Sequence, residues 1–391
     1  MSIFSEELRA LIARHEEALR KPGTILFSQS RYEIDRVLGE GGMGITLLAY
    51  EVSAANLKRP VVLKFVKDSL NPARLDSFLN EVQLSTLFNH PNLLPIYRLE
   101  SEVVKIESRK LRSLHRRDYE HTVYFAVMQY IDGWNLRKIV DRLRSLNLLL
   151  HFDVSMYLIA RIARGLHYVH SYRAENGEHL GLVHRDVSPE NILIDRFGRV
   201  KVADFGIATT WKSLKAEAAL NPGKILYSSP EQLAGAQLDH RSDIYNIGLL
   251  MFFLFTDNDR FGPEWGLPQA QERIRTKMKK SAASDLQGID PRLARMCESC
   301  LQEDPDYRYQ SCEDLATDID IYFKETGRIV TNETVEEILE ELFKDRPTFT
   351  SRRFVALTGS PHLEQPEYHP NSQAEPQTVV GPLPTVRLDE T

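Results

Sequence analysis

The chain has 391 residues and a formal net charge of −6 at pH 7. This weakly acidic balance gives no general attraction for nucleic acids or anionic membranes, so we expect no partner of either kind. No run reaches the roughly 18 consecutive apolar residues of a membrane span, and the N-terminus lacks a basic region followed by an apolar block. The three cysteines favour a reducing compartment over a disulfide framework, so the expected localisation is cytoplasmic.

The first predicted element is an amphipathic helix over residues 6–19. Ser5 precedes it as a candidate N-cap, and apolar residues recur along one of its faces. We expect this helix to pack against the domain that follows, with binding of a partner as the alternative use.

A glycine-rich turn comes next, between two strand-like runs at 32–38 and 45–50. Dinucleotide-binding folds use the spacing G-x-G-x-x-G too, but there the turn leads into a helix rather than into a second strand. We therefore predict a hairpin whose bare backbone approaches phosphate groups, with a purely structural hairpin as the alternative. The turn consists of Gly39, Glu40, Gly41, Gly42, Met43 and Gly44.

An apolar strand over 61–64 ends in Lys64, and a helical stretch over 74–82 contains Glu81. A lysine at the end of a strand is commonly only a solvated charge. Here Glu81 offers a partner, and an ion pair between the two would hold the ammonium where it neutralises phosphate oxygens.

Three further patterns in the sequence resemble binding sites or turns, and each has one favoured interpretation. The basic cluster within 100–122 is interpreted as a solvated extension of two strands, with an anion-binding site as the alternative. Asn176-Gly177 predicts a tight hairpin turn. Cys297 and Cys300 have the spacing of a zinc or redox pair, but they lie in a helical pattern without a second pair, which favours ordinary helix residues. The basic cluster consists of Arg109, Lys110, Arg112, His115, Arg116 and Arg117.

The stretch with the most chemical content runs from His184-Arg185-Asp186 to Asn191, and Asp204-Phe205-Gly206 follows it. Asp186 can accept a hydroxyl proton, while the Asn191 amide and the Asp204 carboxylate can hold a metal ion. Phosphoryl transfer from ATP needs such oxygen-bearing groups around the γ-phosphate. Each motif alone could arise by chance, but the ordered set is a strong indication of this chemistry.

Together these motifs resemble the catalytic core of bacterial-type, eukaryotic-like serine/threonine protein kinases, over about residues 32–325. The resemblance implies an α+β, bilobal protein kinase fold. A small β-rich N-lobe with one key helix would span about 32–128, and a larger helical C-lobe about 132–325. Outside this domain we expect an N-terminal helical extension (1–31), a C-terminal amphipathic helix (326–345) docked on the large lobe, and a disordered tail (346–391).

The resemblance also implies roles for the catalytic residues. Asp186 would accept the proton of the substrate hydroxyl, Lys64 paired with Glu81 would anchor the α- and β-phosphates, and Asn191 and Asp204 would be the metal ligands. The implied cofactors are ATP and Mg²⁺, with Mn²⁺ as an alternative ion.

Further positions follow from the same resemblance. Met128 would be the gatekeeper of the adenine pocket, Asp243 would hold the backbone of the catalytic loop, and Arg308 would pair with Glu231. The residues implied to bind the nucleotide are Gly39, Glu40, Gly41, Gly42, Met43, Gly44, Lys64, Met128, Gln129, Tyr130, Ile131 and Glu190.

The implied activity is transfer of the γ-phosphate of ATP to serine and threonine hydroxyls of proteins, with autophosphorylation, in intracellular signalling. Ser188 and Lys224 stand where this family usually has lysine and threonine. A weakly active or pseudokinase-like scaffold that binds nucleotide, and an enzyme acting on a small molecule, are therefore the alternatives. We suggest that Lys224 reaches back toward Asp186 to replace the missing cation; a solvent-facing loop lysine is the other interpretation.

Regulation is the last sequence-based expectation. Residues 214–224 contain no serine or threonine, so the customary late phosphorylation site is predicted to be absent. Either Glu217 would supply a fixed negative charge, or Thr209 and Thr210 would be phosphorylated. The tail offers hydroxyls for autophosphorylation, which would recruit a phospho-dependent partner: Thr348, Thr350, Ser351, Thr378 and Thr385.

Overall fold

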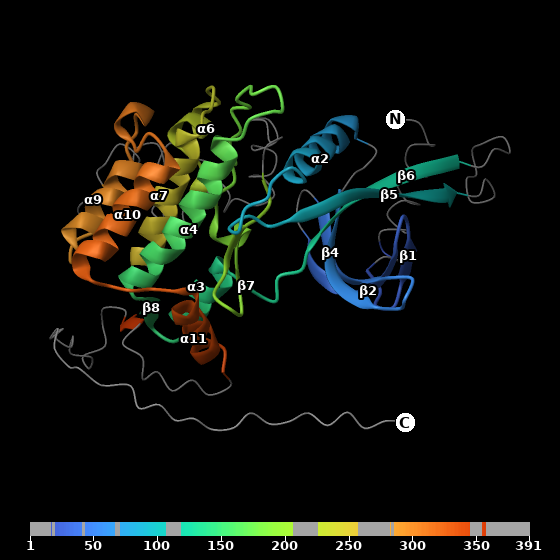
Figure 1. Ribbon diagram of the computed structural model, residues 1–391, viewed down its shortest axis with the longest axis horizontal. Helices are drawn as coiled ribbons and strands as arrows, with labels where there is room; N and C mark the ends of the chain where they lie inside the picture. Colours follow the sequence, from blue (N-terminus) through green and yellow to red (C-terminus); the bar gives the residue numbers. More distant parts are fainter. Residues whose placement is uncertain are drawn as a thin grey trace, which may run out of the picture.

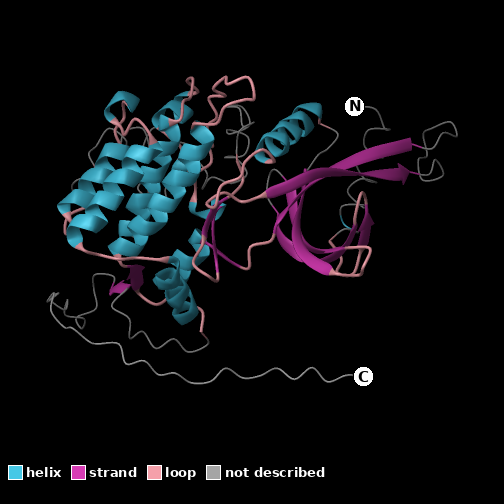
Figure 2. Ribbon diagram, in the orientation of Figure 1, coloured by secondary structure: helices cyan, strands magenta, loops and turns pink. Residues whose placement is uncertain are grey.

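The computed structural model describes residues 17, 20–40, 44–66, 71–106, 119–205, 226–256, 282, 285–344 and 354–356. They form two lobes, one built on a β-sheet and one built from helices, joined by the chain that follows β6 (Figure 1). Figure 2 shows the separation of strands and helices between the lobes. The α+β, bilobal prediction is confirmed.

The small lobe is a six-stranded antiparallel sheet in the order β1-β2-β3-β4-β6-β5. Among the described residues of this lobe one helix, α2 (Pro72–Ser85), lies on a face of the sheet. Strand β1 is only three residues long and was not predicted. The strands are β1 (Ile25–Phe27), β2 (Arg31–Glu40), β3 (Gly44–Val52), β4 (Lys58–Val66), β5 (Ile96–Ile106) and β6 (Tyr119–Gln129).

The two-residue period of β4 decides where its lysine points. Val61, Leu63 and Phe65 enter the core on one face of the sheet. Val62 and Val66 enter the second core, which contains α2 residues. Because successive side chains alternate between faces, Lys64 lies on the α2 side with Val62 and Val66.

The large lobe is built around α7 (Arg241–Thr256), in which every residue from Ser242 to Phe255 is buried. Helices α4 (Phe152–His170) and α9 (Pro291–Cys300) pack against it, and α10 (Cys312–Thr326) packs against α4. The other helices that the structure describes in this region are α3 (Leu136–Arg144), α6 (Pro230–Ala234) and the 3₁₀ turns η2 (Pro189–Asn191) and η5 (Pro305–Tyr307).

Two small sheets complete the large lobe. One has the order β10-β9-β7, formed by β7 (Gly133–Asn135), β9 (Ile192–Asp195) and β10 (Val200–Val202). The other pairs β8 (Leu148–Leu150) with β11 (Phe354–Ala356). Strand β11 falls within residues 346–391, for which the sequence predicted no structure.

The chain beyond α10 forms one more helix, α11 (Asn332–Leu342), which packs on α3 (Figure 1). Its apolar residues at helical spacing are all buried: Val335, Ile338, Leu339 and Leu342. Of the helix predicted over 6–19, only Glu17 is described.

Three smaller predictions meet the structure here. Strands β5 and β6 pair as far as Ile106 and Tyr119, so the strand extension holds on both sides, while the basic cluster at 109–117 lies outside the described residues. Gly177 has φ +81° in a tight turn closed by its N–H on the Ala174 carbonyl at 2.8 Å. The cysteines 297, 300 and 312 are free and buried, and burial raises the pKa of the Cys300 thiol. Among the described helices, none combines the length and apolarity that a bilayer crossing needs.

Candidate active site

Three charged side chains from distant parts of the chain meet between the lobes. The Lys64 Nζ lies 2.9 Å from the Asp204 Oδ1 and 3.4 Å from the Glu81 Oε1. Strand β4 supplies the lysine, α2 supplies the glutamate, and the segment after β10 supplies the aspartate. Lys64 and Glu81 are buried, with 9% and 8% of their surface exposed. The sequence-predicted ion pair is therefore formed, and Asp204 joins it.

Burial and charge act against each other in this group. Burial on its own lowers the pKa of Lys64, but the attraction of Asp204 and Glu81 outweighs it, and the net pKa lies above the usual value for lysine. Burial raises the pKa of Glu81, and Lys64 opposes that rise. Lys64 is therefore a fixed positive charge at neutral pH, directed at an aspartate.

The fully buried Asp243 holds the backbone of the predicted catalytic loop, which runs from His184 to Asn191. Its carboxylate accepts hydrogen bonds from the backbone N–H groups of His184 (2.7 Å) and Arg185 (2.8 Å), and pairs with the His170 Nε2 (2.7 Å). Burial alone would raise the pKa of Asp243, but these partners bring it below its ordinary range. Arg185 has φ +68°, a left-handed backbone that reverses the chain just before Asp186.

Hydrogen bonds within the loop connect Asp186 to Asn191. The Asn191 Nδ2 donates to the Asp186 carbonyl at 2.8 Å, and the Asp186 N–H donates to the His184 Nδ1 at 3.2 Å. The Ala203 N–H donates to the Asn191 carbonyl at 2.8 Å, which places the residue before Asp204 beside Asn191. The backbone thus brings Asp186, Asn191 and Asp204 into one neighbourhood.

Residues of the small lobe hold β10, the strand that ends two residues before Asp204. The Val202 N–H donates to the Asn92 carbonyl and the Leu94 N–H donates to the Val202 carbonyl, both at 2.8 Å. The ring of Phe205 lies 4.5 Å from that of His184 and 5.3 Å from that of Phe88. Asp204 itself has φ +55°. The contacts of Val202 before it and of Phe205 after it therefore hold Asp204 in a backbone conformation that this residue type seldom adopts.

The donor set of Asn191 and Asp204 fits a hard divalent cation. The Asn191 Nδ2 is used by the Asp186 carbonyl, which orients the amide Oδ1 away from that bond; within the described chain this oxygen has no hydrogen bond. The Asp204 side chain is 46% exposed. Mg²⁺ prefers one or two protein oxygens completed by water and phosphate oxygens. No group of three or more His, Cys, Asp and Glu metal ligands occurs among the described residues, so a closed structural site is not formed there.

The segment predicted to bind the nucleobase follows β6. Met128 is buried in the same core as Val62 and Val82. The Gln129 N–H already donates to the Pro95 carbonyl at 3.0 Å. The backbone groups of Tyr130 and Ile131 form no backbone hydrogen bond with any described residue. The Gln129 N–H is therefore occupied, while the backbone groups of Tyr130 and Ile131 are available to the predicted nucleobase.

The glycine-rich hairpin is described at its two ends. Gly39 pairs with Thr46 and Glu40 with Ile45 across the β2–β3 ladder. A Cβ on Gly44 would lie 1.9 Å from the Phe65 carbonyl oxygen, so only glycine fits beside β4. Glu40 forms an ion pair with Arg20 at 3.1 Å. Gly41, Gly42 and Met43 lie outside the described residues, as do Lys224, Glu217, Thr209 and Thr210.

Polar contacts that the sequence did not predict connect the catalytic loop to the rest of the large lobe. The Gln232 Nε2 donates to the Arg185 carbonyl at 2.8 Å, and the Asn246 Nδ2 donates to the Tyr227 carbonyl. Arg137 binds Glu190 at 2.9 Å and the Tyr227 hydroxyl at 3.0 Å. In the sequence, the one indication of these contacts was Asn246, a polar residue inside an otherwise apolar run. The predicted pair of Glu231 and Arg308 is bidentate, at 2.7 and 2.9 Å.

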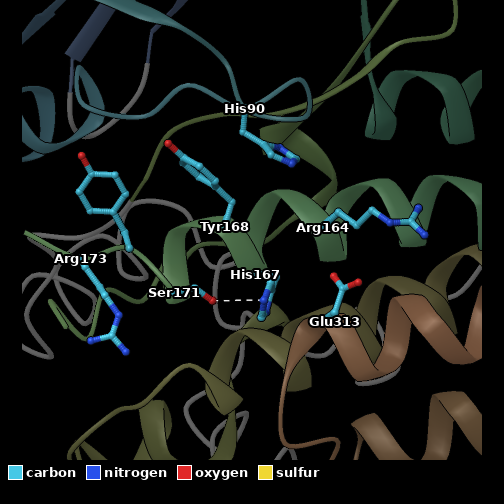
Figure 3. A pocket seen from close by; sticks show the side chains of 8 residues that line it. His90, Arg164, His167, Tyr168, Ser171, Arg173 and Glu313 are labelled. Atoms are coloured by element: carbon cyan, nitrogen blue, oxygen red, sulfur yellow. Dashed lines mark hydrogen bonds between the residues drawn. The ribbon is translucent and has the colours of Figure 1, made fainter. Parts of the chain in front are cut away.

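A cavity of about 510 Å³ lies apart from these residues, beside the end of α4 (Figure 3). In it the Ser171 Oγ and the His167 Nε2 are 3.2 Å apart, and Arg164 is paired with Asp320. None of its lining residues is a predicted site residue. The candidate site is therefore identified by the convergence of Lys64, Asp186 and Asp204. The cavity is lined by His90, Arg164, His167, Tyr168, Ser171, Tyr172, Arg173 and Glu313.

Comparison with protein families places this geometry in context. A family model described as "Protein kinase domain" matches residues 32–318. That range contains each of the predicted catalytic residues and ends before α11.

Similar curated proteins come from several bacteria. A probable serine/threonine-protein kinase of Streptomyces coelicolor is 31% identical over 295 residues, 74% of this chain and 39% of the relative. The serine/threonine-protein kinase PrkC of Bacillus subtilis is 28% identical, over 85% of this chain and 47% of the relative. The tyrosine-protein kinase MasK of Myxococcus xanthus is 28% identical, over 75% and 43%. The chain thus spans less than half the length of each of these relatives.

Proposed function

Because the chain belongs to the protein kinase domain family, we propose that it transfers the γ-phosphate of ATP to serine and threonine hydroxyls of protein substrates. The contact of Lys64 with both Asp204 and Glu81 carries this proposal, because an ammonium and a carboxylate that could hold a metal ion lie together between the lobes. Relatives named as serine/threonine kinases support the choice of acceptor.

Each residue has a defined task in this proposal. Mg²⁺ and ATP, when bound, supply the transferable phosphoryl group and the charge that screens it. Asn191 and Asp204 hold the ion, and Lys64 neutralises the α- and β-phosphates. Asp186 orients the substrate hydroxyl and accepts its proton. The residues do little covalent work, so alignment and neutralisation provide most of the rate.

Substitution of Lys64 and Asp186 tests the assignment. We expect Lys64→Ala and Asp186→Ala to lower phosphate transfer to a generic protein acceptor by about 10²-fold or more, because neutralisation and proton transfer are lost. Lys58→Ala on the same strand and Asp141→Ala on α3, both exposed, should retain activity. Circular dichroism would show that all four variants are folded.

The identity of the acceptor has its own readout. Phosphoamino acid analysis of the acceptor and of the protein itself should give phosphoserine and phosphothreonine. Phosphotyrosine alone would support the specificity named for MasK, and transfer only to small alcohols would overturn the protein-kinase proposal. Undiminished transfer by Asp186→Ala would refute the catalytic assignment, and nucleotide binding without transfer by the wild type would favour a scaffold.

Two finer elements also belong to the proposal. Ser188 is buried at the position where a lysine is usual, so we expect Lys224→Met to reduce turnover if Lys224 supplies the replacing charge. We also propose that phosphorylated tail residues recruit a partner protein, which a pull-down with the phosphorylated and unphosphorylated chain would test.

A further inference from the structure

We propose that α11 is a positioning element for the nucleotide site, acting through stacking of Phe343 on Trp134. The inference rests on the proposed function, since it assumes that the linker between the lobes, residues 130–132 between β6 and β7, binds the nucleobase. It assigns a role to a helix outside the residues that match the kinase family model, which end at 318.

The first contact lies at the linker. The rings of Trp134 and Phe343 are stacked, with centroids 4.1 Å apart and an interplanar angle of 2°. Trp134 lies three residues after Ile131, whose backbone is available to a nucleobase. The Arg142 Nε also donates to the Leu342 carbonyl at 3.2 Å, so the end of α11 is held from α3 as well.

Trp134 has little freedom to move away from the linker. It belongs to β7, which pairs with β9 through Gly133 with Asp195 and Trp134 with Ile194. A Cβ on Gly133 would lie 2.0 Å from the Ile194 carbonyl oxygen, so the two backbones are in close contact. A shift of the Trp134 backbone would therefore move the linker and β9 together.

The second contact lies at the opposite end of α11. A Cβ on Gly198 would lie 2.1 Å from the Asn332 carbonyl oxygen, so the β9–β10 turn rests directly on the start of the helix. Gly198 has φ +73°, which glycine adopts without strain. The Tyr157 hydroxyl and the Asn332 Oδ1 are 2.7 Å apart, which fixes this end to α4.

The second contact lies between the two proposed metal ligands in the sequence, because Gly198 stands between Asn191 and Asp204. Strand β9 begins directly after Asn191, and β10 ends two residues before Asp204. Figure 1 shows α11 beside α3, at the end of the large lobe near β7. One helix thus supports both the linker and the hairpin that connects Asn191 to Asp204.

The effect of the stack on binding is bounded by the strength of one aromatic pair. If the stack favours the linker conformation that binds nucleotide, its loss should weaken binding by about twofold to tenfold. It should not alter the affinity for the protein acceptor, because no acceptor-binding role is assigned to α11.

Calorimetric titration of the full chain with Mg²⁺ and a non-hydrolysable ATP analogue tests this inference. We expect Phe343→Ala to raise the dissociation constant by about twofold to tenfold and Phe343→Tyr to restore it, because the ring stack returns. Ile329→Ala removes an apolar side chain that is 84% exposed and should bind like the wild type. In steady-state assays, Phe343→Ala should raise the KM for ATP and leave the KM for the acceptor unchanged.

A second measurement covers the case in which Phe343→Ala fails to fold. The chain has three tryptophans, and Trp211→Phe with Trp265→Phe leaves Trp134 as the single tryptophan, whose emission can be excited selectively. Its emission should change when the analogue binds, which supports the inference, while constant emission would contradict it. Equal analogue affinity in the wild type and Phe343→Ala would overturn the inference alone. A wild type that binds no analogue would overturn the proposed function as well.

Discussion

Replacing Asp243 by asparagine changes a single atom type in the anchor of the catalytic loop. In the wild type one carboxylate oxygen accepts from the His184 N–H and faces the His170 Nε2, and the other accepts from the Arg185 N–H. Asparagine has only one acceptor oxygen, and its NH₂ group would face at least one of these N–H donors. Either orientation leaves a buried donor without an acceptor.

The expected loss of stability follows from these contacts. A buried unsatisfied donor costs about 1–3 kcal/mol, and hydrogen bonds to a charged group contribute about 1.5–3 kcal/mol each. We therefore expect Asp243→Asn to lower the free energy of unfolding by about 2–4 kcal/mol. Because Arg185 precedes Asp186, release of its N–H should also displace this proposed proton acceptor and reduce kcat by about 10²-fold.

Denaturant unfolding followed by circular dichroism would measure the first quantity, and acceptor phosphorylation the second. Asp141→Asn on the exposed face of α3 is the matched control, with the same chemical change outside any buried network. An Asp243→Asn variant whose unfolding free energy stays within about 0.5 kcal/mol of the wild type, with unchanged kcat, would refute this account of the loop.

Two further predictions concern pH and packing. Burial lowers the pKa of His184 below 6.5, so under acid conditions the unfolded chain binds a proton that the folded chain does not. The free energy of unfolding should therefore be fully maintained above about pH 6.5 and fall as the pH drops below it. Between about pH 7.5 and 5.5, Tm should decrease less for His184→Phe than for the wild type. Parallel pH profiles of the two proteins would be evidence against this account. Gly133→Ala would place its Cβ 2.0 Å from the Ile194 carbonyl oxygen, which should cost about 1–3 kcal/mol in chemical denaturation. Gly39→Ala has open space around it and should leave stability unchanged; equal stability of the two alanine variants would show that the β7–β9 contact relaxes freely.

The residues that meet in the candidate site could be named from the sequence because each motif has its own local signature. The apolar strand that ends in Lys64 and the helical stretch around Glu81 predicted an ion pair between the two residues. The resemblance carried by the motifs around Asp186 and Asp204 then implied the two lobes.

Contacts between distant segments could not be predicted in the same way. The spacing of Val335, Ile338 and Leu342 predicts a buried helix face, but it does not say which surface covers that face. Trp134 and Phe343, which stack on each other, lie more than 200 residues apart in the sequence, and no local pattern relates them. Strands β1 and β11, with three residues each, are too short to show a period.

The hydrogen bonds between α6 and the catalytic loop could not be predicted from the sequence for a different reason. Gln232 is the N3 residue of a capping box on α6, where its side-chain oxygen accepts the Ser229 N–H. Its side-chain nitrogen is then directed to the Arg185 carbonyl. A sequence shows the capping residue but not the second hydrogen bond, which exists only once α6 lies beside the loop.

Two of the four non-glycine residues with positive φ in the described chain, Asn56 and Asn147, are asparagines, a residue type that tolerates this conformation. The other two are Arg185, which precedes the proposed proton acceptor, and Asp204, a proposed metal ligand. At residue 204 the backbone favours glycine, whereas the proposed chemistry requires a carboxylate. Engineering for thermal resistance that relaxed this torsion with glycine would remove the proposed metal ligand, so gains in stability for this protein must be sought away from that position.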